Sequence, residues 1–200
     1  MRIDGRAVSL SEADVRQAIE QRFIEQACGG PLLYVEVTIP ELDVTLPGQT
    51  VPAFTGTPTP DISCGPNCLF TELDYDLGDS VPLLGEKNVT VDLRMTQMNL
   101  KIDAGVNDLD GVKSVTLKLV DPADPTRMIT AASYYRTTRH VQSFTVAGNA
   151  NLDLGSYLQG TKFKGRAELI YDAQTPEFTA TVGARFSLVL KVDYGTYVGL

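Results

Sequence analysis

The sequence predicts an all-β protein, an antiparallel β-sandwich, with a closed β-barrel as the alternative. Apolar residues occupy every second position from Phe178 to Val192. Shorter strand-like runs are separated by turns every ~8–12 residues, a spacing typical of sandwiches and barrels. A period of two places side chains alternately on the two faces of a strand, one toward a core and one toward water. Half-solvated strands of this kind are typical of antiparallel sheets.

The final run, residues 178–192, is the strongest of these patterns. Its alternate residues Thr179, Thr181, Arg185 and Lys191 are polar. Fully extended at about 3.3 Å per residue, the run would be roughly 50 Å long, which exceeds a usual strand. We therefore expect a bend or bulge at Gly183.

Earlier runs predict the remaining strands. The first spans 33–39 and is expected to stop at Pro40. The second, 89–102, changes its inward face by one residue, which a β-bulge at Thr96-Gln97 would accommodate. Further strands are expected at 115–119, 128–135, 141–147 and 163–171.

The only helical pattern lies near the N-terminus. It begins at Ser9 or Ser11, places Val15, Ile19 and Phe23 on one face, and ends before Gly29-Gly30. We expect residues 1–30 to form a helical extension and residues 31–200 to form the sandwich. The apolar face covers the sandwich or docks on a partner or a second copy, so these three residues are the predicted interface.

A proline-rich excursion interrupts the sandwich at about residues 47–68. It contains Cys64-Gly-Pro-Asn-Cys68, whose turn residues would bring both sulfur atoms together, and a local disulfide is expected. Two reduced thiols on a loop are the alternative. A disulfide indicates an oxidising compartment and therefore export, with a cytoplasmic location as the alternative. The polar N-terminus is unlike a signal peptide, so export implies a signal removed earlier.

Charge is distributed unevenly along the chain. The net charge is −8, with 6 Lys+Arg against 15 Asp+Glu in residues 1–100 and 11 against 10 in residues 101–200. Such acidity argues against nucleic acid as the partner. The asymmetry allows three outcomes: the chain folds back on itself, meets copies of itself, or binds cations.

Two stripes of charge stand out in this distribution. Glu72, Asp74 and Asp76 share one strand face, and carboxylates in that arrangement are a candidate calcium site or a solvated face. The turn at 107–111 (NDLDG) also offers oxygen ligands, without EF-hand spacing. Residues Lys162, Lys164 and Arg166 form the opposite stripe on a later strand. No other cofactor is expected.

Catalytic patterns are missing from the sequence. His140 is the only histidine, no nucleophile elbow is present, and no glycine loop leads into a helix. We therefore expect a non-enzymatic protein, with a hydrolase built around His140 as the remote alternative. No apolar run is long enough for a transmembrane helix.

From Val89 onward, about half of the chain resembles exported bacterial jelly-roll proteins. The segments that resemble them are LDGVKSVTLKLVD, NLDLGSYLQGTKFKGRAEL and FTATVGARFSLVLKV. The resemblance implies a jelly-roll sandwich in the cell envelope or outside it and transfers no site residues. We expect a structural or interaction module that assembles with itself or with another envelope protein. The alternative is a sandwich or barrel that binds a sugar, a lipid or calcium.

Overall fold

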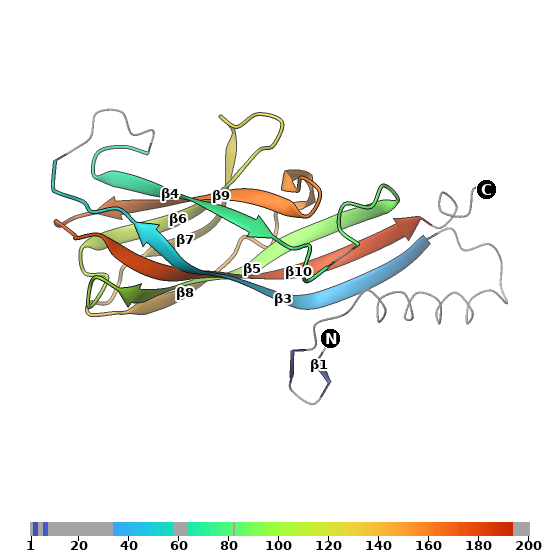
Figure 1. The fold of residues 1–200 in the computed structure, drawn as a ribbon, viewed down its shortest axis with the longest axis horizontal. Coiled ribbons are helices and arrows are strands. Elements are labelled where there is room, and N and C mark those ends of the chain that lie inside the picture. Colours follow the sequence, from blue (N-terminus) through green and yellow to red (C-terminus); the bar gives the residue numbers. More distant parts are fainter. Residues whose placement is uncertain (1, 4–5, 8–33, 58–63, 82, 194–200) are drawn as a thin grey trace.

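The computed structural model describes residues 2–3, 6–7, 34–57, 64–81 and 83–193 (Figure 1). The predicted N-terminal helix, with its interface residues Val15, Ile19 and Phe23, lies outside these residues. Strands β1 (Arg2–Ile3) and β2 (Arg6–Ala7) pair as a short antiparallel ribbon.

Eight further strands form an antiparallel sandwich of two sheets. They are β3 (Tyr34–Val51), β4 (Cys68–Asp76), β5 (Val89–Ala104), β6 (Val112–Val120), β7 (Met128–Tyr135), β8 (Ser143–Ala147), β9 (Lys162–Tyr171) and β10 (Phe178–Asp193). One sheet has the order β3-β10-β5-β8 and the other β4-β9-β6-β7. The only helical element among the described residues is the 3-10 turn η1 (Gly155–Tyr157). The prediction of an all-β sandwich is confirmed, and the closed barrel is excluded.

The pairing is nested. The first of the eight strands pairs with the last (β3 with β10), the second with the second-last (β4 with β9), then β5 with β8 and β6 with β7. A long hairpin rolled into two facing sheets gives this order, which is the jelly-roll arrangement. In Figure 1, β3, β10 and β5 continue well beyond the end of β4 and β9.

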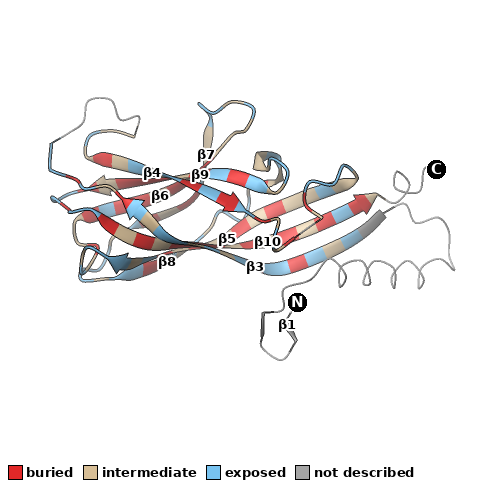
Figure 2. Ribbon diagram, in the orientation of Figure 1, coloured by how far each residue is buried: buried red, intermediate tan, exposed pale blue. Residues whose placement is uncertain are grey.

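The core lies between the two sheets, and burial follows the alternation read from the sequence (Figure 2). In β10, each apolar residue of the two-residue pattern is buried: Phe178, Ala180, Val182, Ala184, Phe186, Leu188, Leu190 and Val192. Aromatic rings link the sheets. Phe163 of β9 meets Phe186 of β10 edge-on at 5.5 Å, and Tyr134 of β7 stacks on Phe144 of β8 at 3.8 Å. Such contacts add to the apolar burial that stabilises the sandwich.

The predicted bulge in β5 is confirmed. Arg185 pairs with Gln97 and the next residue, Phe186, pairs with Met95, so Thr96 is the extra residue. Its hydroxyl donates a hydrogen bond to the carbonyl of Arg185 at 3.2 Å. The bulge keeps both Met95 and Met98 buried although they are three residues apart.

The prediction that the first strand stops at Pro40 was wrong. β3 does not stop at Pro40 but continues through Pro40 and Pro47 to Val51. It is an edge strand, and its two register shifts against β10 fall at these prolines, where a missing N–H removes no regular ladder bond.

Gly183 is not the site of a bulge. It pairs in regular register with Thr45 on one side and Asn99 on the other. A Cβ at this position would lie 2.5 Å from Oδ1 of Asn99, so the glycine makes room for that side chain.

Candidate functional site

The two predicted stripes of charge lie side by side. Glu72, Asp74 and Asp76 on β4 are opposite Arg166, Lys164 and Lys162 on β9, pair by pair. All six residues belong to the outer face of the β4-β9-β6-β7 sheet. The nested strand order explains this placement, because it brings an acidic strand from the first half of the chain against a basic strand from the second.

The same order accounts for the charge asymmetry elsewhere. On the other sheet, Arg185 of β10 binds Asp43 of β3 through two nitrogens, at 2.7 and 3.1 Å. Lys191 lies 3.8 Å from Glu36. The chain therefore folds back on itself to bring opposite charges together, the first of the three outcomes considered above. Self-assembly stays a prediction, but the charge asymmetry no longer supports it, because the opposite charges pair within the chain.

The acidic stripe does not converge. Asp76 contacts Lys162 at 3.1 Å and accepts hydrogen bonds from the backbone N–H of Gly78 at 2.9 Å and the hydroxyl of Thr161 at 2.8 Å. These contacts, led by the Gly78 N–H, lower the pKa of Asp76. Among the described residues, the carboxylate oxygens of Glu72, Asp74 and Asp76 do not form a cluster close enough to hold one metal ion. Calcium at this stripe stays a prediction.

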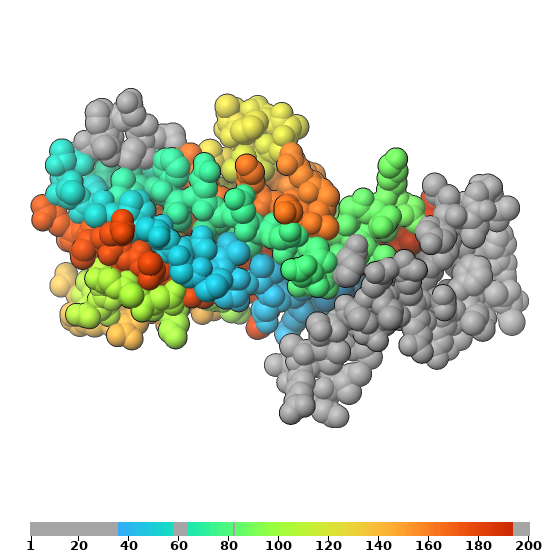
Figure 3. All heavy atoms as spheres, in the orientation of Figure 1, coloured from blue at the N-terminus to red at the C-terminus, as the bar shows by residue number. Residues whose placement is uncertain are grey.

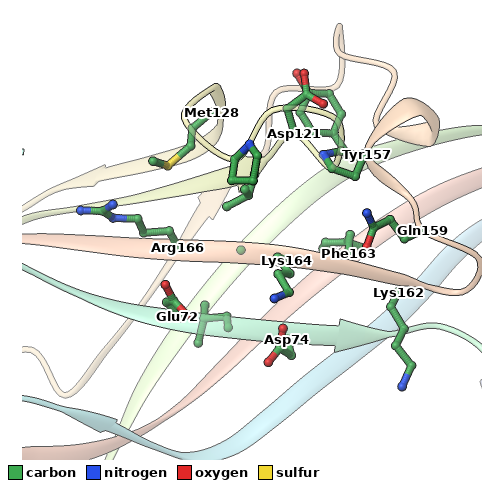
Figure 4. Close-up of a pocket in the computed structure, with 15 residues that line it drawn as sticks. Glu72, Asp74, Asp121, Met128, Tyr157, Gln159, Lys162, Phe163, Lys164 and Arg166 are labelled. Atoms are coloured by element: carbon green, nitrogen blue, oxygen red, sulfur yellow. The ribbon is translucent and has the colours of Figure 1, made fainter. Parts of the chain in front are cut away.

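A groove of about 410 Å³ lies on this same outer face. Its floor is formed by β4 and β9, with Glu72 and Asp74 on one strand and Lys162, Lys164 and Arg166 on the other (Figure 4). The β6–β7 turn forms one wall and the segment around η1 the other. In Figure 3 the β6–β7 turn, in yellow, stands out from the surface beside the orange segment that contains η1.

The first wall is a turn held by its own aspartates. Asp121 accepts the backbone N–H of Ala123 at 2.9 Å, and Asp124 accepts that of Thr126 at 3.1 Å. Bonds of this kind are why aspartate favours turns. The turn brings Asp121, Pro122, Pro125 and Met128 to the groove.

The second wall carries Tyr157 and Gln159. Leu154, just before η1, is buried and donates its N–H to the carbonyl of Leu93 on the opposite sheet at 2.6 Å. Gln159 and Lys162 exchange backbone hydrogen bonds at 2.7 and 3.2 Å, which closes the hairpin into β9. Tyr157 is thus anchored from both sides while its ring remains half-buried at the groove.

The charged groups on the floor differ in how firmly they are held. Arg166 packs its guanidinium over the ring of Phe70 at 3.6 Å, and its Nε lies 3.5 Å from the buried carboxylate of Glu168. By contrast, within the described part of the chain, the side chains of Glu72, Asp74 and Lys164 form no hydrogen bond or ion pair. Three charged groups are therefore available to a ligand in the groove.

The predicted disulfide is present. Cys64 and Cys68 are bonded, with their Cα atoms 5.8 Å apart. Gly65 and Asn67 between them have positive φ angles, 108° and 61°, which these residue types tolerate. Cys68 is the buried first residue of β4, so the disulfide anchors the end of the excursion at the strand that carries the acidic stripe.

His140 does not lie in the groove. Its side chain is 79% exposed, at the loop between β7 and β8, and its Nδ1 lies 3.3 Å from Asp108 and 3.2 Å from Asp110. Among the described residues, the His140 side chain contacts these two carboxylates and no serine. His140 and the 107–111 turn were singled out separately in the sequence, and the structure places them in contact.

Asp121, Tyr157 and Gln159 were not recognised as site residues from the sequence. Residues 121–125 and 155–161 were left only as connections between the expected strands. The local signal is compatible with any surface loop. Only the strand order places both segments over β9.

In the part of the chain that the structure describes, no helix has the length and apolar character needed to cross a membrane.

Comparisons with known proteins give structural neighbours only. No protein-family model matches the chain, and a search of curated proteins gives no match. Desmodium yellow mottle tymovirus is 9% identical, covering 82% of this chain and 91% of that one, with a TM-score of 0.33. A BFDV capsid protein, the 60-mer, is 13% identical over 82% and 96%, with a TM-score of 0.32. A family 32 CBM from C. perfringens NanJ, in complex with galactose, is 10% identical over 74% and 99%, with a TM-score of 0.31. The jelly-roll assignment rests on the strand order of this chain.

Proposed function

We propose that this protein is a non-enzymatic interaction module that binds a sugar in the groove of the β4-β9-β6-β7 sheet. The observation that carries the proposal is the floor of the groove. Glu72, Asp74 and Lys164 lie there without partners among the described residues, beneath a wall that carries the ring of Tyr157.

The size and composition of the groove fit a small hydroxylated ligand. Its volume of about 410 Å³ lies within the ~300–1,000 Å³ range of small-molecule sites. Carboxylates accept hydrogen bonds from hydroxyl groups, and an ammonium group donates to them. Tyr157, Pro122 and Met128 supply apolar surface for the C–H face of a sugar ring.

The other two ligands considered from the sequence, a lipid and calcium, fit this groove less well. A lipid chain would bury the charged floor without giving it hydrogen-bond partners, which costs free energy. Calcium needs converging oxygen ligands, whereas each carboxylate of the stripe lies opposite a cation on β9.

Glycan-array screening of the full chain, followed by titration calorimetry with the best binder, tests the proposal. Replacing Tyr157 by Ala should weaken binding about tenfold, equivalent to about 1.4 kcal/mol. Lys164→Met should weaken it as well. Tyr135→Ala is the matched control, because Tyr135 is an exposed tyrosine of the same sheet that does not line the groove.

An array without a binder, or binding that Tyr157→Ala and Lys164→Met leave unchanged, would reject the groove as a sugar site. The bound glycan should also be recovered intact after long incubation. Cleavage products would contradict a non-enzymatic role.

We also propose that the protein works outside the cytoplasm, in the cell envelope or beyond it. The Cys64–Cys68 disulfide supports this, because such bonds persist in oxidising compartments. Fractionation of the source cells that finds the protein only in the cytosol would contradict it.

Self-assembly is a proposal of the same kind. The described residues leave two large apolar side chains exposed, Phe70 at 38% and Tyr135 at 67%, which is little for an obligate interface. The predicted helix face of Val15, Ile19 and Phe23 would therefore have to supply the contact. Light scattering of the full chain and of Ile19→Asp tests this, and a monomer at all concentrations contradicts it.

A further inference from the structure

A second cluster of polar groups lies at one end of the sandwich, away from the groove. It is built by the loop between β5 and β6, which carries Asp108 and Asp110, and the loop between β7 and β8, which carries His140. The backbone N–H of Leu109 donates to the carbonyl of Val141 at 2.9 Å, so the two loops are fastened together beside the cluster.

Each carboxylate is oriented by a backbone bond. Oδ1 of Asp110 accepts the N–H of His140 at 2.7 Å, and Oδ1 of Asp108 accepts the N–H of Asp110 at 3.0 Å. The remaining oxygens, both Oδ2, then lie 3.2 and 3.3 Å from Nδ1 of the ring. One ligand atom from each residue falls within 4.8 Å of the other two.

Both carboxylates approach the same ring nitrogen, at nearly equal distance. Without a metal ion, a single proton on Nδ1 would have to be shared between the two oxygens in a three-centre hydrogen bond. The nearby Arg136 does not neutralise them, since its guanidinium binds Asp172 at 2.6 Å and the backbone carbonyl of Asp110.

A bound metal ion fits the same geometry. Ligands about 2.0–2.1 Å from a tetrahedral zinc ion are separated from one another by about 3.3 Å. That is the separation of the ring nitrogen from the two carboxylate oxygens here.

We propose that Asp108, Asp110 and His140 form a three-ligand site for a divalent transition-metal ion, with Zn²⁺ as the ion. One imidazole nitrogen and two carboxylate oxygens suit zinc, whereas calcium takes six to eight oxygen ligands. Since the histidine is 79% exposed, the remaining coordination position faces solvent. Water, or a group from another molecule, completes the coordination there.

The test uses the full chain carrying Cys28→Ser, under non-reducing conditions. This background removes the only thiol outside the disulfide, which could otherwise bind zinc. Equilibrium dialysis measures zinc per chain. ¹⁵N NMR of the ring follows Nδ1, because His140 is the only histidine.

We expect one zinc ion per chain and a shift of the Nδ1 resonance on zinc addition. His140→Asn and Asp110→Asn should each weaken binding by at least about tenfold. Asparagine is chosen for position 140 because it tolerates the φ of 57° found there. Asp92→Asn, an aspartate of β5 paired with Arg94, should bind zinc like the parent.

Three results would each overturn the proposal: less than stoichiometric zinc, zinc binding that His140→Asn leaves unchanged, or calcium bound as tightly as zinc. Unfolding of the variants is checked by circular dichroism. If one variant fails to fold, the test rests on the parent protein alone: an Nδ1 resonance that does not shift on zinc addition would then overturn the proposal.

Discussion

Deleting Thr96 and deleting Asn99 should have very different consequences, although the two residues lie three positions apart in β5. Thr96 is the extra residue of the bulge, between Met95 and Met98, whose side chains both face the core. Without Thr96 the strand would alternate regularly and every apolar residue would keep its face. Without Asn99, by contrast, Leu100 would turn outward and Lys101 inward.

The structure sets the size of each effect. Loss of Thr96 removes its hydroxyl bond to Arg185 at 3.2 Å and the bond from the N–H of Gly148 to its carbonyl at 2.9 Å. At about 1 kcal/mol each, the cost is about 2 kcal/mol. Loss of Asn99 exposes Leu100, now 4% exposed, which costs ~1.5–3 kcal/mol. The buried charge of Lys101 adds several more.

Urea unfolding followed by circular dichroism at 25 °C measures both. The Thr96 deletion should unfold cooperatively at lower urea than the wild type. The Asn99 deletion should show no cooperative transition, because its cost approaches the whole stability of a domain, roughly 5–15 kcal/mol. Equal stabilities of the two deletions would refute the role assigned to the bulge.

Two further predictions concern buried and surface groups. The hydroxyl of Tyr75 is buried and has no hydrogen-bond partner among the described residues, and burial raises its pKa. Tyr75→Phe should therefore increase the free energy of unfolding by about 1 kcal/mol in urea titration, and a decrease would indicate a partner for the hydroxyl. The pKa of Asp76 is lowered by the Gly78 N–H and its other partners, so its stabilisation is present above the ordinary pKa of 3.8 and is lost as the pH falls through the lower folded value. When the pH is lowered from 5 to 2, the urea midpoint of unfolding should therefore fall less steeply in Asp76→Asn than in the wild type. Parallel curves for the two proteins would contradict this.

The local features of the fold could be predicted from the sequence because they depend on neighbours along the chain. Alternation in β10, the face change at Thr96-Gln97 and the Cys64–Cys68 turn are all of this kind. Pro40 misled the prediction because proline ends a central strand, whereas an edge strand accommodates it at a bulge.

The groove and the cluster of Asp108, Asp110 and His140 could not be predicted, because both depend on which strands become neighbours. The acidic stripe and Lys164 were recognised separately, but only the pairing of β4 with β9 shows that they share a face. His140 and Asp110 are likewise 30 residues apart and are joined by two loops at the same end.

Amide chemical-shift mapping of the ¹⁵N-labelled protein, titrated with the glycan that binds best on the array, tests the central claim most directly. A sugar in the groove should shift the amides of residues 72–74, 157–159 and 162–166, and those of the β6–β7 turn, 121–128. The opposite sheet and the loop of His140 should remain unchanged. Shifts confined to that loop or to the β3-β10-β5-β8 sheet, or no shifts at all, would contradict the assignment of the groove as the binding site.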